Sequence, residues 1–107
     1  MLKKLFRLSG EDLKDFFLKK SEKIKNDVFL IFYQKNNFPY PRFALYCDQK
    51  IFKGAVRRNK IRRQIYSIIK ELLKEKKIKN YDFFTIVQDK KDFSKLKESL
   101  TKILTNA

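Results

Sequence analysis

The residues with the clearest chemical potential in this sequence are the cations between Arg57 and Arg63. This stretch holds five Arg or Lys side chains and one Asn within seven positions, and no Asp or Glu. Guanidinium and ammonium groups without acidic neighbours are suited to binding phosphates, which accept both their charge and their hydrogen bonds. A helix face that is merely solvated tends to mix both signs of charge. We therefore favour a polyanion as the partner, with nucleic acid ahead of a plain charged surface.

A helix is required to position these cations. Apolar residues recur from Ile61 onward at offsets of 0, 4, 7, 8 and 11, which is the spacing of one helical face. The pattern predicts a helix from about Arg57 to Lys74 that lies on a core and turns its cations outward. The apolar face consists of Ile61, Ile65, Ile68, Ile69 and Leu72.

Composition limits the class of protein. The chain has 107 residues, a formal net charge of +15 and a hydrophobic fraction of 43%. This length predicts one domain, residues 1–107, and the large positive charge is typical of nucleic-acid binding. The one cysteine, Cys47, excludes an intramolecular disulfide, and no apolar run reaches the roughly 20 residues of a membrane-spanning helix. We expect a cytoplasmic protein with no membrane partner.

The side chains offer no catalytic constellation. The sequence contains no His, so Cys47 lacks the usual general base and the commonest transition-metal ligand is missing. The sequence also has no Gly-rich phosphate loop, and its acidic residues are scattered. We expect that the polypeptide does not catalyse a reaction with its own side chains.

The other elements follow from capping signals and periodicity. Ser9 and Asp12 have the spacing of a capping box, which predicts a helix at about Gly10–Lys20. A polar loop is expected at residues 21–27. A last helix is expected to be capped by Asp89 or Asp92 and to present one apolar face, made of Phe93, Leu96, Leu100, Ile103 and Leu104.

Three apolar runs have the length and composition of strands, at residues 28–33, 42–47 and 81–87. The first two flank a proline-containing turn, so we expect them to form an antiparallel pair, with the third strand central. The predicted fold is α+β, a small mixed sheet with helices packed on it, in the order α-β-β-α-β-α. The general rule for β-α-β units predicts a right-handed crossover between residues 42–47 and 81–87.

The aromatic residues admit two interpretations. Most Phe and Tyr side chains of so small a protein belong to the core. Alternation places Phe32 and Tyr33 on opposite faces of their strand, however, and one of these faces is free to form a groove beside Phe17. A basic groove with aromatic side chains is typical of proteins that bind single-stranded nucleic acid.

The stretch from Ala55 to Arg63 resembles the protein subunit of bacterial ribonuclease P. That family's signature places Arg-Asn-Arg/Lys after an Ala-Val pair, followed by a hydrophobic residue and two more cations. Arg58–Arg63 matches this signature position by position. The first helix is also similar, through Arg7-Leu8, Glu11-Asp12 and Phe17.

The resemblance implies a noncatalytic partner of a catalytic RNA that holds Mg²⁺. The holoenzyme is an endoribonuclease that removes the 5′ leader from precursor tRNA. The resemblance also implies a left-handed β-α-β crossover, which takes precedence over the general rule. The implied contacts with ribonuclease P RNA are Lys50, Lys53, Arg57, Arg58, Asn59, Lys60, Arg62 and Arg63. The implied contacts with the leader are Leu13, Phe17, Phe32 and Tyr33.

The sequence departs from the family pattern at several positions. Leu13 stands where the family has an aromatic residue, Ala44 where it has Gly, and Tyr66 where it has a late Arg. Two alternatives remain open, a generic basic RNA-binding protein of ribosomal type and a basic helix that lies on a membrane surface. A generic basic protein would have a similar positive charge, but this function would not explain why Asn59 lies between two cations.

Overall fold

The computed structural model describes residues 3–90 and 92–107 as four strands with helices on both sides. The α+β class and the order of the six expected elements are confirmed. The elements are the short 3₁₀ helix η1 (Lys4–Phe6), α1 (Gly10–Leu18), β1 (Glu22–Lys25), β2 (Phe29–Lys35), β3 (Arg42–Cys47), α2 (Ala55–Lys74), β4 (Tyr81–Val87) and α3 (Phe93–Thr105).

The strands form one mixed sheet in the order β1-β2-β4-β3. Strand β2 is antiparallel to both β1 and β4, whereas β3 is parallel to β4. The expected antiparallel pairing of residues 28–33 with 42–47 is therefore wrong, because β4 lies between these strands. The expected central position of β4 is confirmed, because β2 and β3 pair with its two edges, and Phe83 and Val87 are fully buried on the face that the helices cover.

Strand β1 corrects the expectation of a loop at residues 21–27. It lies at the edge of the sheet, and only Ile24 packs against the core, while Lys23 and Lys25 are exposed. Lysines on an edge strand hinder pairing with a second sheet. Because this strand carries one apolar residue, its sequence has no strand periodicity.

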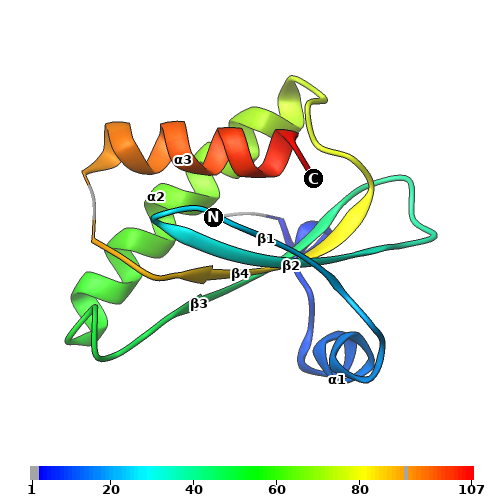
Figure 1. Ribbon diagram of the computed structural model, residues 1–107, viewed down its shortest axis with the longest axis horizontal. Coiled ribbons are helices and arrows are strands. Elements are labelled where there is room, and N and C mark those ends of the chain that lie inside the picture. Colours follow the sequence, from blue (N-terminus) through cyan, green and yellow to red (C-terminus); the bar gives the residue numbers. More distant parts are fainter. Residues whose placement is uncertain (1–2, 91) are drawn as a thin grey trace.

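The helices divide between the two faces of the sheet (Figure 1). Helices α2 and α3 cover one face, and α1 lies on the other. The core lies beneath α2 and α3, where Ile65, Leu96 and Leu100 pack on the sheet residues Phe29 and Phe83. The opposite face is covered only at the end where α1 lies.

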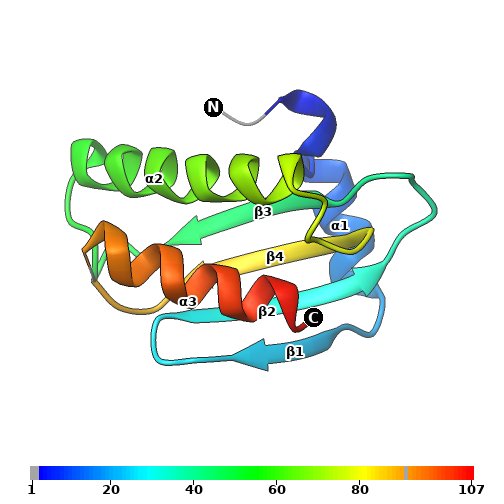
Figure 2. The same cartoon turned by 90° about the horizontal axis from the view of Figure 1, so that it is seen from above.

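The β3-α2-β4 crossover is left-handed (Figure 2). This view looks onto the face of the sheet that carries α2 and α3. Strand β3 points to the left, the chain then passes through α2 on the viewer's side of the sheet, and the parallel strand β4 follows below β3. The general rule of right-handed crossovers therefore gives the wrong result here. The handedness implied by the family resemblance is the one observed.

Local signals correctly placed the helix starts. Ser9 and Asp12 form a capping box in which Ser9 Oγ accepts from the Asp12 amide at 3.2 Å and Asp12 Oδ2 accepts from the Ser9 amide at 2.8 Å. Asp92 caps α3 by accepting from the Lys95 amide at 2.9 Å. These bonds satisfy amides that the first helical turn leaves free.

Candidate RNA-binding surface

The N-terminal half of α2 presents the predicted cations to solvent. Its apolar side is buried, with Ile61 5% and Ile65 0% exposed, so the helix is fixed on the core. Arg58 is half-buried and donates from Nη1 to the carbonyl of Phe52 at 3.3 Å. The exposed residues of the predicted set in α2 are Arg57, Asn59, Lys60, Arg62 and Arg63.

The loop before α2 adds two more exposed cations, Lys50 and Lys53. Buried Phe52 anchors this loop, and Gly54 enters the helix with φ at +86°, a conformation that favours glycine. Within the described residues, no ion pair involves a cation between Lys50 and Arg63. The structure therefore brings all eight predicted RNA-subunit residues to one end of the molecule, and seven of them are cations without an acidic partner among the described residues.

One flank of α2 faces β3 through Arg58, Arg62 and Tyr66, which follow each other at four-residue spacing. Burial raises the pKa of the Cys47 thiol, and the charges of Arg62 and Arg58 oppose this rise. Cys47 is therefore a neutral core thiol at neutral pH.

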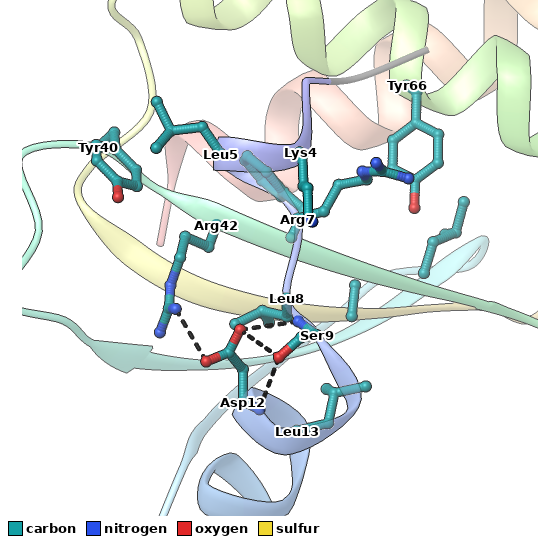
Figure 3. A pocket seen from close by; sticks show the side chains of 13 residues that line it. Lys4, Leu5, Arg7, Leu8, Ser9, Asp12, Leu13, Tyr40, Arg42 and Tyr66 are labelled. Carbon is teal, nitrogen blue, oxygen red and sulfur yellow. Dashed lines mark hydrogen bonds and ion pairs between the residues drawn. The ribbon is translucent and has the colours of Figure 1, made fainter.

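The hydroxyl of Tyr66 also lies in a cationic environment. Burial raises the pKa of Tyr66, and the charges of Arg62 and Arg7 oppose the rise. Arg7 lies beside the Tyr66 ring (Figure 3). Sequence reasoning did not assign Arg7 to this surface, because it precedes α2 by about fifty residues and only the fold brings it there.

The other flank of α2 borders a hollow of about 430 Å³. Arg57 and Lys60 line it together with Lys90 and Phe93. The side chain of Phe93 is 42% exposed, although its spacing had placed it on the apolar face of α3. Lys90 and Phe93 are therefore further candidates for contact with RNA. The sequence alone did not assign them to this surface, because no local pattern places them beside α2.

A second, smaller hollow of about 270 Å³ lies between α1 and the open face of the sheet. Phe17 and Phe32 both line it, and Phe17 is 62% exposed. Phe17 also contacts Phe84 edge-on, with ring centroids 5.2 Å apart. Gln34 Nε2 holds this end of α1 in place by donating to the Phe16 carbonyl at 2.6 Å.

The structure does not bring the other two predicted leader residues into this hollow. Tyr33 lies on the opposite face of β2 and stacks on Tyr81 with centroids 5.3 Å apart. Side chains alternate along a strand, so Phe32 and Tyr33 cannot share a face. Leu13 lines a different hollow of about 550 Å³, one turn earlier on α1 (Figure 3).

A network of charges fixes α1 to the sheet. The Arg42 guanidinium donates to Asp82 Oδ1 at 2.9 Å and to Oδ2 at 2.7 Å, and it pairs with Asp12 at 3.2 Å (Figure 3). The hydrogen bond from the Ser9 amide contributes most to lowering the pKa of Asp12, and Arg42 adds to this. The N-terminus of α1 therefore has a fixed position beside β3.

The described residues contain neither a cluster of metal-ligating side chains nor a membrane-spanning helix. No group of three or more metal-ligating side chains lies together within residues 3–90 and 92–107. Over the same ranges, no helix has the length and apolarity needed to cross a membrane. The carboxylates in this part of the chain therefore do not form a cluster that could bind a divalent ion.

Comparisons with known proteins agree with this geometry. The family model for ribonuclease P matches residues 2–107. The ribonuclease P protein component of Mesoplasma florum is 31% identical over 90 residues, covering 81% of each chain. Its counterpart from Ureaplasma parvum is 33% identical over 79 residues, covering 74% of this chain and 67% of that protein.

Solved structures have the same fold. The ribonuclease P protein of Thermotoga maritima superposes with a TM-score of 0.77 at 27% identity, over 89% of this chain and 93% of that one. A Staphylococcus aureus ribonuclease P protein gives a TM-score of 0.79 at 22% identity, over 94% of both chains, which supports the fold alone. The chain belongs to the ribonuclease P protein family and is the noncatalytic protein component of a ribonucleoprotein endoribonuclease that processes tRNA 5′ ends.

Proposed function

We propose that the N-terminal half of α2 binds ribonuclease P RNA and that the hollow between α1 and the sheet receives the 5′ leader of precursor tRNA. The observation that carries the first part is the arrangement of the cations. Residues 49–70 contain no Asp or Glu, and the cations of Arg57, Lys60 and Arg63 are exposed on a helix held rigidly by its apolar side. Such charges neutralise phosphates and release counterions.

The contact surface extends beyond the family signature in this proposal. Arg7 supplies a cation beside Tyr66, at the position where the signature has an arginine. Lys90 and Phe93 extend the other flank of α2. The RNA would therefore contact both flanks of the helix.

The leader proposal depends on Phe17 and Phe32. Both side chains line the same hollow, and the open face of β2 and β4 continues from it with partly exposed apolar residues. Stacking on aromatic rings suits the bases of a single strand, and Lys23, opposite Phe32 on β1, can approach its phosphates. The proposed leader contacts are Phe17, Phe32 and Lys23, without Tyr33.

The Mg²⁺ ions belong to the RNA in this proposal. The protein's role toward them is to lower the repulsion between two RNA backbones, so that fewer ions are required to hold them together. Its location is proposed to be the cytoplasm, where precursor tRNA is found.

The binding proposal is tested by the affinity of the protein for the ribonuclease P RNA of Mesoplasma florum across a range of salt concentrations. Arg57→Ala/Arg63→Ala removes two exposed cations without disturbing the core. We expect the slope of log affinity against log salt to become shallower by about 1.4 to 1.8, because each of the two lost phosphate contacts removes roughly 0.7 to 0.9.

The matched control is Lys97→Ala/Lys102→Ala, which removes the same charge from the exposed side of α3. It should leave the slope within about 0.3 of the wild type if the contacts are local. Equal effects of both double variants would mean that only the net charge matters, and the proposed surface would be wrong.

A further inference from the structure

A second cationic surface lies at the opposite end of α2 from the family signature. Two adjoining hollows of about 250 and 700 Å³ meet there and share Phe6 and Leu73. Sixteen residues separate Arg58 from Lys74, which is about 24 Å along a helix. Figure 2 shows η1 beside the last turns of α2, with the loop between β2 and β3 at the same end.

The apolar part of this surface includes two aromatic rings, Phe6 and Tyr40. Phe6 contacts Tyr40 edge-on at 5.7 Å, and Tyr40 stacks on Phe38 at 5.4 Å. Both Phe6 and Tyr40 are half-buried, so each ring keeps an accessible part while the protein holds it in place. Fixed aromatic rings of this kind serve as stacking platforms for nucleobases.

The charged residues that line the two hollows are all lysines. Lys70 and Lys74 line the smaller hollow, and Lys76 and Lys79 line the larger one. All four are exposed. We call this set, together with Phe6, Tyr40 and Leu73, the Phe6 surface.

The acidic residues near this end of α2 are engaged elsewhere. Glu71 pairs with Lys97 at 3.2 Å on the side of α3, and Glu75 pairs with Lys77 at 2.7 Å. Within the described residues, neither glutamate pairs with a lysine of the Phe6 surface. The charge that remains toward the Phe6 surface is therefore positive, and it complements a polyanion.

The backbone at Lys76 supplies an independent observation. Lys76 has a φ of +54°, and it is the non-glycine residue with positive φ in the part of the chain that the structure describes. It ends α2 with the hydrogen bonds of a Schellman motif, a position that favours glycine. Here a lysine occupies the strained position, and its side chain lines the larger hollow.

We propose that the Phe6 surface is a second binding site for single-stranded RNA, separate from both the α2 N-terminal cations and the leader hollow. A base stacks at Tyr40 and Phe6, and the adjacent phosphates lie against Lys70 and Lys74. The larger hollow is in the size range of pockets that hold a nucleotide-sized ligand. The site goes beyond the proposed function, because it needs neither the RNA subunit nor the leader contacts.

The test is carried out with the full chain in a background variant that is weakened at both proposed RNA contacts, Phe17→Ala/Arg57→Ala/Arg63→Ala. Binding of a fluorescein-labelled ten-residue oligouridylate is measured by anisotropy at several salt concentrations. The background is expected to retain binding. Adding Lys70→Gln/Lys74→Gln should make the salt slope shallower by about 1.4, or roughly 0.7 for each phosphate.

Tyr40→Leu in the same background tests stacking, since leucine keeps an apolar side chain but loses the aromatic face. We expect it to weaken oligouridylate binding about tenfold. A thermal melt of each variant establishes that it remains folded. Lys14→Gln/Lys102→Gln, at two exposed positions outside the Phe6 surface, is the control with equal charge loss and should leave the slope unchanged.

Three results would overturn the proposal. The first is that the background variant binds no oligouridylate in this assay. The second is that both lysine pairs lower the slope equally. The third is displacement of the RNA by a ten-residue polyglutamate at equal concentration, which would assign the surface to an acidic polypeptide. Loss of RNA-subunit binding in the background variant, by contrast, concerns only the function proposed for the α2 N-terminal cations.

Discussion

Arg42 and Asp82 form a two-pronged ion pair, with nitrogen–oxygen distances of 2.9 and 2.7 Å. Their side chains are only 16% and 12% exposed, and Arg42 also reaches Asp12 at the start of α1. This pair therefore joins β3, β4 and α1. It sets the position of the helix that carries Phe17.

Arg42→Ala should lower the free energy of unfolding by about 3 kcal/mol, because it leaves Asp82 with a largely buried, unpaired charge. Urea denaturation measures this loss. Lys77→Ala, which breaks the exposed pair with Glu75, should cost less than about 0.5 kcal/mol. Similar losses in the two variants would show that the Arg42 pair does not hold α1 to the sheet.

Signals between residues close in the sequence were sufficient to predict the helices. The Ser9–Asp12 capping box and the apolar repeat of α2 depend on residues close in the chain, and both are confirmed. The central position of β4 was also predicted from its adjacent apolar residues Phe83 and Phe84, but only Phe83 is fully buried, whereas Phe84 is half-buried on the open face.

Long-range features could not be predicted in this way. The insertion of β4 between β2 and β3 depends on pairing between distant segments, and the choice between Phe32 and Tyr33 depends on which face α1 covers. Arg7, Arg42 and Phe93 acquire their surroundings only through the fold. The patterns around them in the sequence do not indicate which distant residues they meet.

Acid should destabilise the protein partly through Asp12. The Ser9 hydrogen bond and Arg42 hold the pKa of Asp12 below its usual value of 3.8, so the unfolded chain binds this proton more readily. The stabilisation is present above about pH 4 and is lost as the pH falls through the folded pKa. Because Asp12 is 32% exposed, its contribution is at most about 1 kcal/mol.

Urea denaturation of the wild type and Asp12→Asn between pH 6 and 3 measures this contribution. The difference between the two proteins should narrow as the pH falls. A constant difference across this range would exclude ionisation of Asp12 as its source.

Lys76→Gly should stabilise the protein by about 0.5–1 kcal/mol, because glycine adopts the positive φ of this position without steric cost. Thermal or urea denaturation measures the gain. Lys74→Gly, inside the last turn of α2, is the matched control and should lower stability by about 1 kcal/mol. A loss of stability in Lys76→Gly would contradict the left-handed conformation of Lys76.

Phe17→Ala should weaken binding of precursor tRNA by the reconstituted holoenzyme about tenfold, provided that the leader spans several nucleotides. A substrate with a one-nucleotide leader should bind both proteins equally. Leu18→Ala, at the neighbouring and 84% exposed position, is the control and should behave as the wild type. An equal loss with both substrates would place Phe17 outside the leader path.

The central claim is that the cations at the start of α2 join this protein to a catalytic RNA. Its most direct test is the rate of leader removal from precursor tRNA at low Mg²⁺ by Mesoplasma florum ribonuclease P RNA with added protein. Wild-type protein and Lys97→Ala/Lys102→Ala should stimulate cleavage equally, whereas Arg57→Ala/Lys60→Ala/Arg63→Ala should need at least tenfold more protein for the same rate. Equal stimulation by all three proteins, or none by the wild type, would contradict the claim.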